Sequence, residues 1–100
     1  MAENVAIAST AGTDDSAEIV IESGASVLFF MDGAIEADEF VEFYLSKGGS
    51  KSTEKLKDSK PELSPITMSA ARPMVPLSGP LHVFAVKSAT NGAKALKYYS

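Results

Sequence analysis

The chain of 100 residues contains no cysteine and no tryptophan, and it has a single histidine. Without cysteine the fold cannot be a disulfide scaffold, and no metal can be held by thiolates. The composition is compatible with a reducing cytoplasm. The length predicts one domain over residues 1–100 with a small core. The hydrophobic fraction of 45% is that of a globular protein.

Long apolar runs are also missing. The longest is Val27–Met31, whereas a membrane-spanning helix needs about 18 apolar residues. The N-terminus carries Glu3 and no basic residue, so it lacks the basic segment that opens a secretory signal. We therefore expect no membrane partner and no export by that route.

Basic residues are absent from the first part of the chain. Residues 1–46 hold ten acids and no lysine or arginine, and residues 47–100 hold nine bases and three acids. The two parts carry −10 and +6, which together give the net charge of −4. By default, such segments interleave within one fold and neutralise each other. Alternatively, opposite poles favour head-to-tail or ring association.

The hydrophobic pattern predicts strands and almost no helix. The continuous apolar run at 26–31 indicates a central strand buried on both faces. Asn91-Gly92 predicts a C-terminal antiparallel hairpin, because both positions of a type I′ turn need positive φ. Further strands are expected at 4–9, 17–22, 39–46, 81–87 and 93–99. This spacing predicts an all-β fold, a small antiparallel β-sandwich or β-barrel-like domain with extended arms.

Several segments are expected to lie outside the central strands. Residues 1–16 form an N-terminal strand or arm, and residues 47–61 form a mobile polar loop or an exposed hairpin. Residues 72–76 contain two prolines, so they suit an edge strand or an extended arm. Residues 34–40 could form a single helical turn.

No catalytic, cofactor-binding or metal-binding residue is predicted, and we expect no enzyme. His82 shares a strand face with Phe84 and Val86, and no G-x-S-x-G motif accompanies it. The acidic stretch 32–39 does not match an EF-hand loop. Residues 48–52 lack the first glycine of a P-loop at the required spacing.

A lysine-rich segment raises the question of nucleic-acid binding. Tyr98 and Tyr99 offer stacking surfaces, but the pI of about 4.8 is far below that of most nucleic-acid-binding domains. A solvated loop is the better interpretation, and nucleic acid is disfavoured as a partner. The lysines concerned are Lys47, Lys51, Lys55, Lys57 and Lys60.

The order of elements over residues 25–100 resembles that of small auxiliary virion proteins of tailed bacteriophages. The apolar strand 25–31 precedes a strand that ends in Ser-Lys-Gly-Gly at 46–49. A polar hairpin and a proline-rich connection then lead through Leu77-Ser78-Gly79-Pro80 into the strand at 81–87. Similar compact β-sandwich or β-tulip domains occur in capsid decoration (cement) proteins and in some tail or fibre attachments.

The resemblance implies a structural virion protein on the capsid surface, made in the host cytoplasm. It would stabilise the bacteriophage head by bridging major capsid protein subunits, or bind another virion protein, as a homo-oligomer (trimer or dimer). Extended segments suit strand addition to neighbours. The contact residues expected on this basis are Asn4, Val5, Ile7, Lys51, Lys55, Lys57, Arg72, Met74 and Val75.

Two other classes of function remain open. One is a phage tail, fibre or adaptor component, or a carbohydrate- or protein-binding β-sandwich module. A glycan-binding module would need an aromatic platform, for which the candidates are Phe40, Tyr44, Tyr98 and Tyr99. The other is a small enzyme, in which His82 would be essential.

Overall fold

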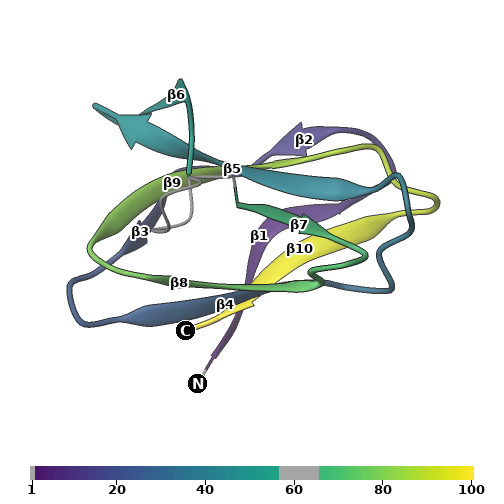
Figure 1. Cartoon of the computed structure of the whole chain (residues 1–100), viewed down its shortest axis with the longest axis horizontal. Helices are drawn as coiled ribbons and strands as arrows, with labels where there is room; N and C mark the ends of the chain where they lie inside the picture. Colours follow the sequence, from purple (N-terminus) through teal and green to yellow (C-terminus); the bar gives the residue numbers. More distant parts are fainter. Residues whose placement is uncertain (1, 57–65) are drawn as a thin grey trace.

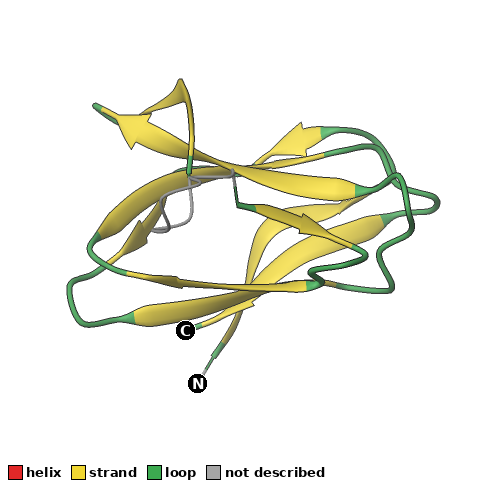
Figure 2. Cartoon of the chain, viewed as in Figure 1, coloured by secondary structure: helices red, strands yellow, loops and turns green. Residues whose placement is uncertain are grey.

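A computed structural model describes residues 2–56 and 66–100, and the described chain is built from strands, turns and loops without a helix (Figure 2). The all-β prediction is confirmed. In chain order the strands are β1 (Glu3–Thr10), β2 (Asp14–Asp15), β3 (Ile19–Ile21), β4 (Ser26–Met31), β5 (Phe40–Lys47), β6 (Ser50–Lys55), β7 (Thr67–Ser69), β8 (Met74–Ser78), β9 (Leu81–Lys87) and β10 (Lys94–Tyr99).

The strands form two antiparallel sheets, as expected for a small β-sandwich or barrel-like domain (Figure 1). The first sheet has the order β1-β10-β4-β8. The second has the order β2-β9-β5-β6, with β3 also paired to β9 and β7 also paired to β5. Consecutive strands thus often lie in different sheets, so most of the pairing joins residues distant in sequence.

The core lies between the two sheets and is built from alternate residues of each strand. Phe29 of β4 is fully buried and meets Phe43 of β5 edge-on, with ring centroids 5.0 Å apart. The ring of Tyr98 of β10 packs beside that of Phe29, with ring centroids 5.2 Å apart. This aromatic contact joins the first sheet to the second. The other buried hydrophobic residues of the cluster are Ile7, Ile19, Ile21, Val27, Met31, Val41, Ile66, Met68, Val75, Leu77, Val83, Ala85 and Leu96.

The expectation that residues 26–31 are buried on both faces is wrong. Val27, Phe29 and Met31 are buried, while Leu28 and Phe30 point outward and are only half-buried. In a two-layer sandwich each sheet has one face toward the core and one away from it. No third layer covers the outer side of β4 among the described residues.

The predicted C-terminal hairpin is also wrong. Although Gly92 has a φ of 86°, β9 pairs with β5, β2 and β3, whereas β10 pairs with β1 and β4. The connection crosses between the sheets because its backbone groups bond elsewhere. Thr90 donates its N–H to the carbonyl of Ala11, and the Asn91 N–H goes to the carboxylate of Glu39.

The segments expected as arms or loops are largely built into the sheets. Residues 3–10 form β1, paired along β10, so the strand and not the arm is the alternative found at the N-terminus. Residues 40–55 form the β5–β6 hairpin, with Gly48 and Gly49 at φ of 63° and 84°, as a type I′ turn requires. Of the two alternatives expected for residues 47–61, a mobile loop or an exposed hairpin, the structure has the hairpin up to Lys55, and residues 57–61 lie outside the described chain. The helical turn expected at 34–40 is absent, since Phe40 begins β5 and the residues before it form a loop.

The proline-containing segment forms the edge strand β8, one of the two alternatives expected for it. Pro76 lies opposite Leu28 of β4. A proline fits an edge strand because its missing N–H can face away from the ladder. β1 is the other edge of the first sheet.

The charges of the two parts of the chain interleave, as the default interpretation expected. Four lysines from the second part each pair with an acid from the first, across strands or between loops. The pairs are Lys51–Asp15 at 2.8 Å, Lys55–Glu42 at 2.7 Å, Lys94–Glu39 at 2.7 Å and Lys97–Glu3 at 3.3 Å.

Gly79, which leads into β9, is the glycine most tightly constrained by its surroundings. A Cβ at this position would lie 1.9 Å from the carbonyl oxygen of Glu22 and 2.4 Å from that of Ile21. We predict that Gly79→Ala lowers the free energy of unfolding by about 3 kcal/mol or more, because backbone atoms cannot move aside. Urea unfolding measures the change. Gly12→Ala is the control, since its Cβ would meet only the Thr10 hydroxyl at 3.8 Å. Equal stability of the two variants would contradict the prediction.

Candidate interaction surface

The residues expected to contact a partner lie on three edge strands and one turn. β1 carries Asn4, Val5 and Ile7, and β8 carries Met74 and Val75. Arg72 precedes β8 and pairs through its backbone with Ser69. Lys51 and Lys55 lie on β6, at an edge of the second sheet. Lys57 lies outside the described residues.

Strand alternation separates the expected residues of the first sheet into two groups. Ile7 and Val75 are core residues, 2% and 0% exposed, so their side chains cannot meet a partner of the folded protein. Val5 and Met74 point outward and are 60% and 53% exposed. Asn4 is half-buried, and its side-chain amide donates to the hydroxyl of Ser100, 2.9 Å away. Of the residues expected to contact a partner, only Val5 and Met74 therefore offer outward apolar side chains.

The outer side of the first sheet presents two rows of side chains, one residue from each strand. The strand register sets Val5, Lys97, Phe30 and Met74 in one row across β1, β10, β4 and β8. The same register sets Glu3, Tyr99, Leu28 and Pro76 in the next row. Six of these eight residues are apolar or aromatic. We call Val5, Leu28, Phe30, Met74, Pro76 and Tyr99 the apolar outer face.

The centre of the apolar outer face is preorganised. Phe30 and Tyr99 stack with ring centroids 4.6 Å apart and an interplanar angle of 19°. The ammonium of Lys97, between Val5 and Phe30, lies 3.3 Å from Glu3 and 3.8 Å from Asp32. The positive charge of Lys97 is therefore neutralised by carboxylates of the same chain. A surface of this kind suits an apolar protein partner better than a charged one.

Three members of the apolar outer face were not among the expected contacts, whereas Pro76 belongs to the segment 72–76 that was expected to meet a partner. Leu28 and Phe30 were assigned to the core, and Tyr99 was considered only for base stacking and glycan binding. The available signal was the uninterrupted apolar run at 26–31. In an all-antiparallel domain of two layers, such a run places apolar side chains on the outer side as well. The run thus indicated an exposed apolar surface.

The aromatic residues considered for glycan binding do not form one platform. Tyr98 packs on Phe29 in the core, and Tyr99 belongs to the apolar outer face. Phe40 and Tyr44 lie on β5, on the outer side of the second sheet. The four rings are thus divided among the core and two opposite faces of the molecule.

The lysines of β6 are neutralised by carboxylates. Hydrogen bonds to Asp15 and Glu42 raise the pKa of Lys51 and of Lys55, respectively. Their ammonium groups also lie 5.4 and 5.9 Å from the centre of the Tyr44 ring. This part of the second sheet is thus a set of paired charges and not an open basic patch.

His82 lies on the outer side of β9, on the same face as Phe84 and Val86, as expected from strand alternation. Its side chain is 56% exposed, and Nδ1 is 3.6 Å from a carboxylate oxygen of Glu18. The Glu18 carboxylate also accepts a hydrogen bond from the hydroxyl of Ser46. These groups lie on an open sheet surface.

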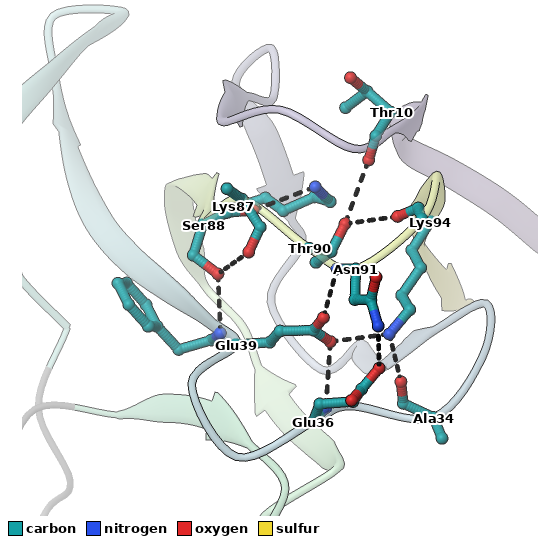
Figure 3. Close-up of polar contacts among 12 residues, drawn as sticks. Thr10, Ala34, Glu36, Glu39, Lys87, Ser88, Thr90, Asn91 and Lys94 are labelled. Carbon is teal, nitrogen blue, oxygen red and sulfur yellow. Dashed lines mark hydrogen bonds and ion pairs between the residues drawn. The ribbon is translucent and has the colours of Figure 1, made fainter.

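A buried polar cluster closes the end of the sandwich where three loops meet (Figure 3). Glu39, 2% exposed, accepts hydrogen bonds from Lys94 at 2.7 Å and from the backbone N–H of Asn91 at 2.6 Å. The N–H of Glu36 donates to it at 3.0 Å, and Lys94 also donates to the carbonyl of Ala34. The pKa of Glu39 is lowered to about 2, chiefly by the backbone hydrogen bonds from Asn91 and Glu36 and then by the hydrogen bond from Lys94.

A second buried cation lies beside this cluster. Lys87 is fully buried and donates to the carbonyls of Gly12 at 2.8 Å and Ser88 at 3.0 Å. Burial lowers the pKa of its ammonium. No buried side-chain nitrogen or oxygen lacks a partner in the part of the chain that the structure describes. The cluster therefore fastens loops to one another.

Comparisons with known proteins found no matching family model, no similar curated protein and no similar solved structure. Among the described residues, no three histidine, aspartate or glutamate side chains gather so as to hold a metal ion. The described part of the chain also has no helix of the length and apolarity needed to cross a membrane.

The lowered pKa of Glu39 makes stability depend on acid. The folded state holds this carboxylate ionised down to about pH 2, whereas the ordinary pKa of a glutamate carboxyl is 4.5. The unfolded chain therefore takes up the proton first. The stabilisation is complete above about pH 4.5 and is lost as the pH falls from there toward 2. We predict that Glu39→Gln flattens this part of the curve of unfolding free energy against pH.

Denaturant unfolding at a series of pH values measures the curve. Asp38→Asn, in the same loop with an exposed side chain, is the matched control and should retain the wild-type slope. If Glu39→Gln retained the full wild-type slope, the assignment of the acid sensitivity to Glu39 would be wrong.

Proposed function

We propose that this protein is a structural component that works by binding other proteins, through the apolar outer face and the two edge strands beside it. The observation that carries the proposal is the outward orientation of Leu28, Phe30 and Tyr99 between the exposed Val5 and Met74. Exposure of a contiguous apolar surface to water raises the free energy of a small domain, and burial of that surface against another protein lowers it.

The assembly we propose is a bacteriophage head. In this proposal the protein decorates the capsid surface as a cement protein and bridges major capsid protein subunits, after synthesis in the host cytoplasm. The resemblance of residues 25–100 to small auxiliary virion proteins supports it, as does the compact β-sandwich. The edges β1 and β8 are each paired on one side only among the described strands. Edges of this kind can accept a strand from a neighbouring subunit.

A tail, fibre or adaptor component is the nearest alternative, because it would use the same apolar contacts at a different place in the virion. Copy number separates the two. A cement protein is stoichiometric with the shell protein, whereas a tail component is present in few copies. A carbohydrate-binding function has less support, since the candidate aromatic residues lie on different faces.

The test uses virus particles produced from the genome that encodes this chain. We predict that quantitative mass spectrometry of purified particles finds the chain in numbers comparable to the major capsid protein. Particles without the chain should bind it when it is added back. Met74→Asp should weaken this binding about tenfold, because a carboxylate at an apolar contact must be desolvated.

Val20→Asp is the matched control. Val20 is also an exposed valine on a strand, 46% exposed, but it lies on the second sheet. It should bind as the unchanged chain does. A few copies per particle would indicate a tail component, and complete absence from purified particles would refute the virion proposal.

A further inference from the structure

Each of the two rows on the outer side of the first sheet is complementary to the same row of a second copy of the chain. We propose that the apolar outer face binds the same face of a second copy of this chain, in a two-fold dimer whose axis runs parallel to the strands. The inference rests on the proposed function and narrows it: the second copy occupies the apolar outer face, and the edge strands β1 and β8 remain for the shell protein.

The strand order makes the two rows match. A two-fold axis along the strands, between β10 and β4, places β1 of one copy over β8 of the other and β10 over β4. Val5 then faces Met74, and Tyr99 faces Leu28. In the same rows Lys97 faces the ring of Phe30, a favourable cation–π arrangement, and Glu3 faces Pro76. No two like charges are opposed, and the apolar side chains meet one another.

The ion pairs on this face also favour a second copy of the chain over an acidic partner. Lys97 is 23% exposed at its side chain and is already paired with Glu3 and Asp32. An acidic partner would have to displace both carboxylates. A second copy leaves these ion pairs intact and needs only the apolar contacts.

The size of the face sets the strength of the dimer. Four strands spaced by about 4.8 Å, each with about six residues at 3.4 Å, give roughly 400 Å² on each copy. The total of roughly 800 Å² is below the roughly 1,200 Å² of stable complexes. The dimer should therefore form in solution at high protein concentration, and also where a surface holds many copies close together.

The absence of cysteine from the chain allows single reporter thiols. Val5→Cys and Met74→Cys are prepared separately, mixed in equal amounts and treated with a short bis-maleimide. We expect the mixture to cross-link several-fold more than either variant alone. The reason is that Val5 faces Met74 of the other copy, while the two Val5 positions lie at opposite edges, about 14 Å or more apart.

The control pairs Val20→Cys, on the second sheet, with Met74→Cys and should give only background cross-linking. Light scattering of the unchanged chain should show a mass that rises with concentration. Met74→Asp should remain a monomer, and Val20→Asp should behave as the unchanged chain. Cross-linking of Val5→Cys alone as strong as that of the mixture, or a monomer at all concentrations, would overturn the proposed dimer.

The two proposals fail separately. If the mixture does not cross-link while Met74→Asp still weakens binding to particles, the dimer is wrong and the proposed function stands. If the mixture cross-links while the chain is absent from particles, the dimer stands and the virion proposal fails.

Discussion

The contact of Phe29 with Phe43 across the two sheets is the interaction on which the rest of the structure depends. Residues of a strand point alternately to opposite sides. Because Phe29 points into the core, Leu28 and Phe30, its immediate neighbours on the strand, must point outward, and both happen to be apolar. The exposed apolar surface of the first sheet is thus a consequence of how the core is packed. It could be removed by outward polar residues without any change to the core.

Electrostatic pairing complements this packing. The acidic first part and the basic second part of the chain are brought together wherever a late strand or loop lies beside an early one, as with Lys94 and Glu39 or Lys97 and Glu3. The first of these pairs is buried and hydrogen-bonded on all sides, so it fixes loops in place. The second is partly exposed, and it neutralises the charge of Lys97 in the middle of an otherwise apolar surface.

The fold class was predictable, because alternation and turn residues are local signals. A sandwich or barrel-like domain was expected from the spacing of the strands, and an edge strand was one of the two alternatives expected for residues 72–76 from Pro73 and Pro76. The predictions that failed were those that depend on contacts between residues distant in sequence. Asn91-Gly92 has the residues of a hairpin turn, but the carboxylate of Glu39, distant in sequence, binds its backbone and the strands on either side enter different sheets. Likewise, whether Phe30 is covered depends on the number of layers, which the strand itself does not encode.

The burial of Lys87 has a chemical consequence. An amine that is fully enclosed and bonded to the carbonyls of Gly12 and Ser88 is out of reach of acylating reagents. It reacts only during excursions in which the loops at this end separate, while exposed lysines such as Lys47 and Lys51 are modified at once. The rate at which Lys87 is acylated therefore reports how often this end of the sandwich opens.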